Sequence, residues 1–141
     1  MDISKFYING NFVGPDGSEK IDIVNPATEK VVGQVISGSI KDVDNAIKSA
    51  NNAFSKAEAL TLDQKKKILE EIIEGMEERR EDFAQIISEE MGSPIKMARR
   101  AQYGSGVIHF KNTLSVIDRF NFKEVHGNIT INKIPIGPVG M

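Results

Sequence analysis

Short stretches of alternating apolar and polar residues predict β-strands over residues 6–36. Asn9-Gly10 separates two apolar stretches, and this pair is the strongest short signal for a two-residue hairpin turn. Ile21 and Ile23 alternate with a polar residue, which predicts a further strand. Asn25-Pro26 ends that strand, because proline has no N–H and restricts the residue before it to extended geometry. The valines that follow, up to Ile36, predict one more strand.

From residue 39 the apolar positions recur at the spacing of amphipathic helices. Ser39 with Asp42, and Thr61 with Gln64, form capping boxes that predict the starts of two helices. We expect the second helix to continue to Gly92. Ser93 as N-cap and Pro94 at the first position predict the start of a third. The apolar faces comprise Val43, Ala46, Ile47, Ala50, Ala53 and Phe54 in the first helix, Leu69, Ile72, Ile73, Met76, Phe83, Ile86 and Ile87 in the second, and Ile95, Ala98, Ala101, Val107, Ile108, Leu114 and Ile117 in the third.

The last part of the chain returns to a strand pattern. Apolar residues alternate on both sides of His126-Gly127-Asn128, which predicts a β-hairpin over residues 120–134. An apolar run, residues 134–140, follows the hairpin. Within the third helix, Gly104 and Gly106 each lower helix stability by about 1 kcal/mol relative to alanine, so we expect them to mark close packing.

The composition excludes several kinds of chemistry in this chain. The 141 residues include no cysteine, which excludes disulfides, cysteine-bound metals and a thiol nucleophile within this chain. Lys plus Arg is 18 and Asp plus Glu is 20, so the net charge of −2 gives no reason to expect nucleic acid or an anionic membrane as a partner. No signal peptide or long apolar run is found, and we predict a cytoplasmic protein. An excess of isoleucine (19) over leucine (4) is typical of a bacterial genome poor in G and C.

The residues alone predict no active site. Gly104-Ser105-Gly106 does not complete a dinucleotide motif, because His109 stands where the third glycine would be and the segment lies inside a predicted helix. Neither His109 nor His126 has a plausible nucleophile nearby, so each is interpreted as structural or solvated. The carboxylates between Glu70 and Glu90 mostly fall on the polar face of a helix, where solvation is expected. We therefore predict neither catalytic nor cofactor-binding residues in this chain.

Five segments, in order, carry a family resemblance. They are Tyr7-Ile8-Asn9-Gly10 with Phe12-Val13, Val24-Asn25-Pro26-Ala27-Thr28, Asp42-Val43-Asp44 with Ala46-Ile47, Ala50 and Ala53-Phe54, Glu89-Glu90-Met91-Gly92-Ser93-Pro94, and Ile134-Pro135-Ile136-Gly137-Pro138-Val139-Gly140. Together they resemble the N-terminal part of the NAD(P)-dependent aldehyde dehydrogenase superfamily.

This resemblance implies an α+β fragment, made of short strands, three amphipathic helices and a hairpin, from an α/β Rossmann-type enzyme. Residues 1–119 would pack on the cofactor domain, 120–134 would form the hairpin of the oligomerisation region, and 135–141 would begin the first Rossmann strand. The family's catalytic cysteine, glutamate and asparagine would lie beyond Met141. NAD or NADP would then serve the parent enzyme, and the chain alone would be catalytically inactive and bind neither.

Two further expectations follow from the resemblance. Some relatives hold a structural monovalent cation, and residue-by-residue transfer points to Ile23, Val24 and Glu90 as candidates. A further ligand would lie beyond Met141, so we commit to no metal site and favour an ordinary helix-end role for Glu90. The expected partner is the remainder of the parent enzyme. The alternative hypothesis is a stand-alone module without enzymatic activity, which associates with itself through exposed apolar faces.

Overall fold

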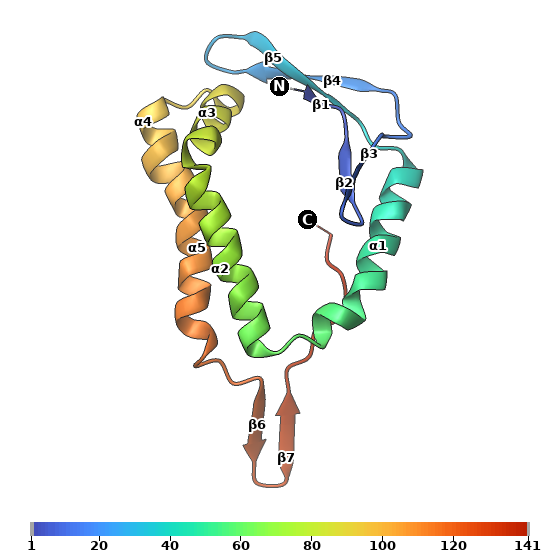
Figure 1. The fold of residues 1–141 in the computed structure, drawn as a ribbon, viewed down its shortest axis with the longest axis vertical. Helices are drawn as coiled ribbons and strands as arrows, with labels where there is room; N and C mark the ends of the chain where they lie inside the picture. Colours follow the sequence, from blue (N-terminus) through green and yellow to red (C-terminus); the bar gives the residue numbers. More distant parts are fainter. Residues whose placement is uncertain (1, 141) are drawn as a thin grey trace.

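The computed structural model describes residues 2–140. A three-stranded sheet lies above two separate helical arms, and a hairpin projects from the opposite end (Figure 1). In chain order the elements are β1 (Asp2–Ile3), β2 (Phe6–Ile8), β3 (Asn11–Val13), β4 (Lys20–Asn25), β5 (Lys30–Ile36), α1 (Ile40–Glu58), α2 (Leu62–Glu78), α3 (Arg80–Met91), α4 (Ile95–Met97), a π-helical turn (Ala98–Gln102), α5 (Tyr103–Ile117), β6 (Lys123–His126) and β7 (Ile129–Asn132). The α+β character expected from the sequence is confirmed.

The sheet has the strand order β1-β5-β4. β4 and β5 are antiparallel, with Lys20 opposite Ile36 and Asn25 opposite Lys30, as the alternation around Ile21 and Ile23 predicts. β1 pairs with β5 in parallel, and this two-residue strand was not expected. A strand so short carries too few alternating positions to be recognised in the sequence.

β2 and β3 form the predicted hairpin around Asn9-Gly10. The ladder ends at the pair Ile8 and Asn11, so the turn consists of two residues. Asn9 has a φ of 53° and Gly10 a φ of 75°. Asparagine and glycine tolerate this left-handed region better than other residues, and left-handed turns match the twist of paired strands.

Both capping boxes form as the sequence predicts. The Ser39 hydroxyl accepts the N–H of Asp42 and the Asp42 carboxylate accepts the N–H of Ser39, at the start of α1. Thr61 and Gln64 make the same reciprocal pair at the start of α2. Both helices therefore begin where local side-chain chemistry places them.

The expectation of one continuous helix up to Gly92 is wrong. The helix breaks at Arg79, whose φ of −104° and ψ of 20° are not helical, and α3 starts at Arg80. Neither proline nor glycine marks this break in the sequence. Its physical reason is tertiary, because α3 packs against the π-helical turn and β4, whereas α2 packs along α5.

The start of the third helical segment also differs from the expectation. Ser93 is not its cap: Pro94 precedes Ile95 without a side-chain cap, and the Ser93 carbonyl instead accepts the hydroxyl of Ser88 at 2.7 Å. After three α-helical residues the chain makes a π-helical turn, closed by the N–H of Tyr103 on the carbonyl of Ala98.

The core is small and lies where α2, α3 and α5 meet. Ile73, Tyr103 and Val107 are buried together, while Ala84 and Ala98 are fully covered. Met76, Ile87, Phe110 and Leu114 pack against this centre. Ala101 and Ile108, also on the predicted apolar face of this helical segment, are exposed.

The two glycines of α5 behave differently from each other. A Cβ on Gly104 would meet no atom within 4 Å, so its expected close packing is wrong. One on Gly106 would touch the Met76 methyl at 3.4 Å, which agrees with close packing of α5 on α2. None of the helices in the described part of the chain is long and apolar enough to cross a membrane.

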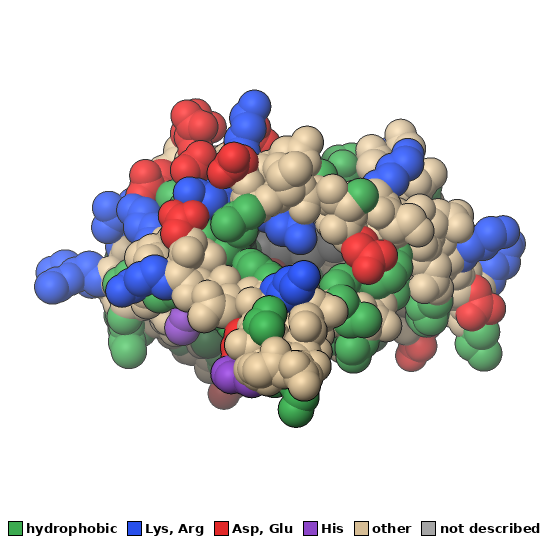
Figure 2. Space-filling model, turned by 90° about the horizontal axis from the view of Figure 1, so that it is seen from below, with side chains coloured by type: hydrophobic (Ala, Val, Ile, Leu, Met, Phe, Trp, Pro, Cys, Tyr) green, Lys and Arg blue, Asp and Glu red, His purple; other side chains and the backbone are tan. Residues whose placement is uncertain are grey.

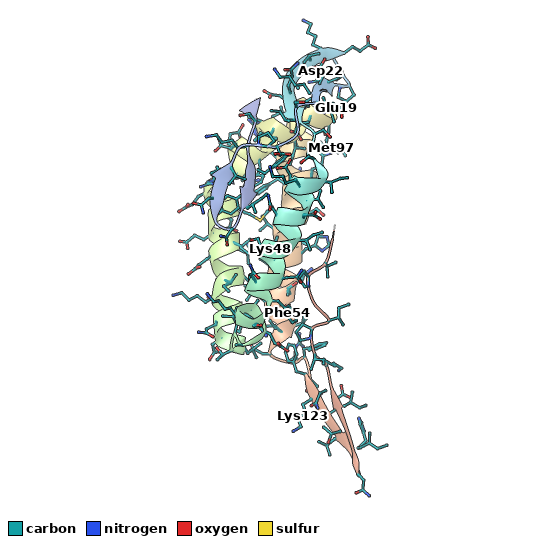
Figure 3. All side chains as sticks on the ribbon, turned by 90° about the vertical axis from the view of Figure 1, so that its right-hand side faces the viewer. Glu19, Asp22, Lys48, Phe54, Met97 and Lys123 are labelled. Carbon is teal, nitrogen blue, oxygen red and sulfur yellow. The ribbon has the colours of Figure 1, made fainter. Side chains whose placement is uncertain are left out.

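β6 and β7 form the predicted C-terminal hairpin, with His126 opposite Ile129. Figure 3 shows it projecting beyond the helices, with Lys123 on the hairpin and Phe54 at the end of α1 from which the projection starts. The following residues, 133–140, contain no strand and run back along α1, where Pro138 and Val139 share a hollow with Ala46 and Ile47. Their expected role as the first Rossmann strand stays a prediction.

Many apolar side chains remain at the surface. On α1, Val43 and Ile47 of the predicted apolar face are about half exposed, at 53% and 52%. Seen from below, hydrophobic side chains form several separate surface patches (Figure 2). The helical periodicity is therefore correct for α1, but the described residues supply no full cover for its apolar face.

Candidate functional site

Two of the segments that carry the family resemblance meet in space at the end of β4. The Asn25 side-chain oxygen accepts the N–H groups of Ala27 (2.9 Å) and Thr28 (3.2 Å), and its backbone carbonyl accepts that of Glu29 at 2.8 Å. Asparagine is suited to this role because its side chain reproduces part of a backbone turn. The result is a tight turn over residues 25–29 at the edge of the sheet.

Gly92 ends α3 directly against that turn. Its φ of 65° is left-handed, and a Cβ at this position would lie 2.8 Å from the N of Ala27 and 2.9 Å from the Cγ of Pro26. Only glycine combines this backbone conformation with so close an approach. The Asn25-Pro26 turn and the Gly92 helix end therefore form one packed unit, although 67 positions separate Asn25 and Gly92.

The candidate cation ligands Ile23 and Val24 lie in β4, just before this unit. The pairing of β4 with β5 shifts between them, since Ile23 is opposite Gly33 and Val24 opposite Val31. Such bulges bend a strand and occur frequently beside functional sites. No pattern in the sequence signals this irregularity.

Glu90, the third candidate, is an exposed residue in the last turn of α3. No hydrogen bond or ion pair of its carboxylate is found within residues 2–140. No group of three or more His, Cys, Asp or Glu side chains suited to a metal occurs in the same part of the chain. The candidate cation site would instead use the backbone carbonyls of Ile23 and Val24 together with Glu90. Nothing in the structure tests this ligand set, and the site stays a prediction.

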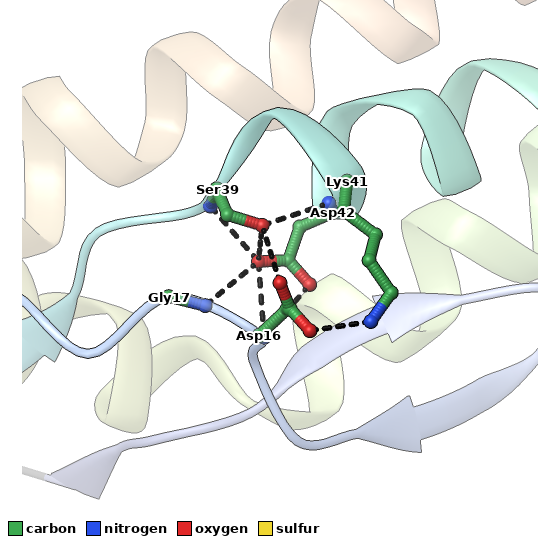
Figure 4. A network of polar contacts seen from close by, with 5 residues as sticks. All are labelled: Asp16, Gly17, Ser39, Lys41 and Asp42. Atoms are coloured by element: carbon green, nitrogen blue, oxygen red, sulfur yellow. Dashed lines mark hydrogen bonds and ion pairs between the residues drawn. The ribbon is translucent and has the colours of Figure 1, made fainter.

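Asp42, at the start of α1, lies at the centre of a network of polar contacts (Figure 4). Its carboxylate accepts the N–H groups of Asp16 (3.0 and 3.1 Å), Gly17 (3.2 Å) and Ser39 (2.9 Å), and the hydroxyl of Ser39 at 3.0 Å. The residue is 7% exposed. Asp42 therefore fixes the 15–18 loop to the N-terminus of α1.

These donors set the charge state of Asp42. The backbone N–H of Asp16, followed by that of Ser39, lowers the pKa of the carboxyl from 3.8 to about 2, against the opposing effect of burial. Hydrogen bonds to a carboxylate favour its ionised form. Lys41 completes the network through an ion pair with the Asp16 side chain at 2.5 Å. The arrangement is structural, because the carboxylate oxygens of Asp42 serve the protein's own donors.

Sequence reasoning found Asp42 as a capping residue and missed its contact with Asp16 and Gly17. Capping chemistry acts over three residues and is visible in a sequence. The contact with the loop depends on how the strand region returns to the helix, and no local pattern encodes it.

The residues tested for cofactor chemistry are not brought together. Gly104-Ser105-Gly106 lies inside α5, as predicted, and not at the strand-to-helix turn that binds a dinucleotide phosphate. His109 is exposed on α5, and His126 in β6 contacts Glu124 at 3.3 Å. Neither the glycines nor the histidines of residues 2–140 thus form a dinucleotide-binding turn.

Comparison with known proteins identifies the origin of this architecture. Residues 12–141 match the model of the aldehyde dehydrogenase family. A Staphylococcus haemolyticus protein assigned to the aldehyde dehydrogenases is 33% identical over 135 residues, which cover 96% of this chain and 28% of that protein.

Solved structures agree with the sequence match. The aldehyde dehydrogenase of Bartonella henselae superposes with a TM-score of 0.86 at 35% identity, over 91% of this chain and 27% of its own. Aldehyde dehydrogenase C of Pseudomonas syringae, a cysteine-to-alanine variant in complex with NAD+ and octanal, superposes with a TM-score of 0.84 at 37% identity. The match covers 88% of this chain and 26% of that chain.

The fold is thus an α+β portion of a Rossmann-type dehydrogenase. The chain belongs to the aldehyde dehydrogenase family, and it spans about three tenths of the length of the curated relatives it matches.

Proposed function

We propose that this chain is the N-terminal segment of a bacterial NAD(P)-dependent aldehyde dehydrogenase. The observation that carries the proposal is the combination of a family match over residues 12–141 with coverage of only 25–30% of related chains. Its contribution to the whole enzyme is structural: it supplies packing surfaces, and the remainder of the same enzyme is its partner.

The resemblance implies a reaction in which a cysteine thiolate attacks the aldehyde carbon and water later hydrolyses the thioester to a carboxylic acid. A bound nicotinamide would supply the hydride acceptor for this reaction. This chain has no cysteine to act as nucleophile. We therefore propose that the 141 residues alone are catalytically inactive and bind neither NAD nor NADP.

The exposed faces support this structural role. Val43 and Ile47 on α1 and Ile136 in the tail, the last at 95% exposure, are the kind of surface that another domain covers. We propose that the cofactor domain packs on the α1 face and that the β6–β7 hairpin belongs to the oligomerisation region. The whole enzyme would be a cytoplasmic oligomer.

The experiment compares the 141-residue chain with the product of the complete reading frame that contains it. We expect the longer product to reduce NAD+ or NADP+ when an aldehyde is added, and the 141-residue chain to show no turnover. Reduced nicotinamide is measured by its absorbance. Aldehyde-dependent turnover by the short chain, or the absence of a longer family member encoded at this locus, would contradict the proposal.

A second candidate function rests on the exposed hairpin. Val125 and Ile129 are 64% and 65% exposed on β6 and β7, and an apolar hairpin with free edges can pair with a second copy. The chain would then be a self-associating module without enzymatic activity. Light scattering of the purified chain tests this function, because a monomer at high concentration is incompatible with it.

A cation-dependent stabilisation of the β4 end is the remaining element of the proposal. Ile23 and Val24 would offer carbonyl oxygens and Glu90 a carboxylate, with a further ligand from the rest of the enzyme. The bulge at Ile23 and Val24 and the proximity of α3 to β4 support it. The isolated chain would lack a complete ligand set.

A further inference from the structure

The side chain of Asn9, in the turn of the β2–β3 hairpin, has no structural role within residues 2–140. Asn9 is exposed and precedes Gly10, and this is the one Asn-Gly pair in the sequence. The structure shows no hydrogen bond to the Asn9 side-chain amide or to the Gly10 N–H within residues 2–140; only the backbone carbonyl of Asn9 is engaged, by the Asn11 side chain at 3.0 Å.

The space around the following peptide bond is open. A Cβ on Gly10 would meet no atom within 4 Å. The last ladder pair is Ile8 with Asn11, so the Gly10 N–H lies outside the strand pairing. An exposed amide followed by an unhindered, unpaired glycine N–H is the arrangement required for attack of that nitrogen on the side chain.

We propose that Asn9 is a site of spontaneous deamidation, with water as the co-reactant. The deprotonated nitrogen of Gly10 attacks the Cγ of Asn9 and forms a five-membered succinimide. The bond from Cγ to Nδ2 breaks, and the nitrogen leaves as ammonia. Water then opens the ring at one of its two carbonyls. The product is either an ordinary aspartate at this position or its isoaspartyl isomer, in which the backbone runs through the side chain.

Two other asparagines in turns lack part of this arrangement. Asn128 is exposed in the β6–β7 turn, but the next residue is the β-branched Ile129, which pairs with His126 in the ladder. Asn25 is followed by Pro26, which has no N–H to react, and its side-chain oxygen holds the N–H groups of Ala27 and Thr28. We therefore expect Asn9 to react faster than these two asparagines because of its local structure. Asn128 serves as a control within the same molecule.

The hairpin permits the backbone motion that ring closure requires. Each strand has three residues, and isolated two-stranded hairpins are marginally stable in water. Tyr7 and Phe12, at 67% and 72% exposure, cross the ladder with ring centroids 5.1 Å apart. Local opening of such a unit is a low-energy event compared with global unfolding.

The isoaspartyl product would change the hairpin itself. It adds one methylene to the backbone of a two-residue turn whose length sets the strand register. It also adds one negative charge, taking the formal net charge from −2 to −3. We expect the ring contact between Tyr7 and Phe12 to be lost in the isoaspartyl form and kept in the ordinary aspartyl form, which an Asn9→Asp variant reproduces. Nuclear Overhauser effects between the two rings report the contact.

The test incubates the complete 141-residue chain in mildly alkaline buffer made with oxygen-18 water, followed by peptide mass spectrometry. An asparagine that reacts during the incubation loses its amide nitrogen and gains one oxygen-18, and fragment ions separate this change at Asn9 from label taken up at Asp16-Gly17. We expect the Asn9 peptide to acquire the label on the order of tenfold faster than the Asn128 peptide, because a β-branched residue hinders the latter. Equal labelling of the two, or an unlabelled Asn9 peptide, would overturn the proposal.

Two glycine variants provide matched controls. Asn9→Gly keeps the turn, since glycine adopts a φ of 53° without penalty, and it removes the reacting amide. We expect this variant to accumulate no isoaspartate in the first hairpin, and Asn128→Gly to leave the Asn9 rate unchanged. Unaltered isoaspartate formation in Asn9→Gly would show that the reaction occurs elsewhere. The reaction requires only the hairpin, so its outcome is independent of the proposed enzyme function.

Discussion

The carboxylate of Asp42 accepts the backbone N–H of Asp16, which lies 26 residues earlier in the chain, through both of its oxygens at 3.0 and 3.1 Å. Because Asp42 also belongs to the capping box of α1, one side chain stabilises a helix start and a loop from the strand region together. The loss of this carboxylate should therefore affect two elements.

Replacing Asp42 by asparagine should destabilise the chain more than replacing Asp44, which is exposed on the same helix. Asparagine removes the charge and one acceptor and leaves the N–H groups of Asp16, Gly17 and Ser39 poorly satisfied. Urea unfolding followed by circular dichroism measures the difference. Equal midpoints for Asp42→Asn and Asp44→Asn would contradict the role assigned to Asp42.

The same carboxylate predicts a dependence of stability on pH. Its pKa is lowered in the folded chain from 3.8 to about 2, so the folded form binds fewer protons than the unfolded form between these values. The stabilisation is complete above pH 3.8 and is lost as the pH falls through about 2. The Asp42→Asn variant should therefore lose less stability than the original chain as the pH falls from 3.8 to about 2. The pKa of Glu81 is also lowered to about 2, mainly by its hydrogen bond to Arg99. Its effect on the pH dependence of stability is the same in both proteins and cancels in the comparison.

Replacing Gly92 by alanine should destabilise the chain by at least about 1–2 kcal/mol, the typical penalty for a left-handed residue with a Cβ. The contact with Ala27 and Pro26 adds to this penalty, because a Cβ would approach both to less than 3 Å. Gly75→Ala is the matched control with the opposite sign. That glycine lies within α2 with nothing within 4 Å of a Cβ, and alanine there should stabilise by about 0.5–1 kcal/mol.

Tyr103 tests the small core. Its hydroxyl donates to the Met76 carbonyl at 3.1 Å, and the residue is 7% exposed. Tyr103→Phe should lower the free energy of unfolding by about 1 kcal/mol, the usual net value of one hydrogen bond. Tyr7→Phe, at an exposed position, should stay within about 0.5 kcal/mol of the original chain. If both variants lowered the free energy of unfolding to a similar extent, the hydrogen bond of Tyr103 would not be the cause.

Glu90 tests the cation hypothesis on the isolated chain. Because its carboxylate is exposed and a further ligand is expected elsewhere, Glu90→Gln should change the unfolding free energy by less than about 0.5 kcal/mol. Replacing potassium or sodium by a bulky organic cation at constant ionic strength should also leave thermal unfolding unchanged. Clear stabilisation by a small cation, lost in the variant, would show that this chain completes the site alone.

The fold was predictable from the sequence wherever one element contains its own signal. Ser39 and Thr61 predict helix starts, and Asn9-Gly10 predicts a turn, because each acts on neighbours within three residues. The break at Arg79 and the bulge at Ile23 and Val24 depend on contacts between distant elements, so no local pattern could predict them. The candidate site was recognised only through family resemblance, and the packing of Gly92 on Ala27 became visible only in three dimensions.

The π-helical turn has a consequence for how chain length can vary in this segment. Residues five apart on a regular α-helix point about 140° away from each other, at about 100° per residue. Ala98 and Tyr103 are nonetheless both buried, because the turn between them contains one additional residue. Deleting one residue of Ala98–Gln102 would leave the two residues four positions apart, about 40° on a regular α-helix, so Tyr103 and Val107 would still face α2. The turn thus holds one additional residue without changing which side of the helix faces α2, and we expect a single-residue deletion to be tolerated better here than inside α5, where it would rotate the following residues by about 100°.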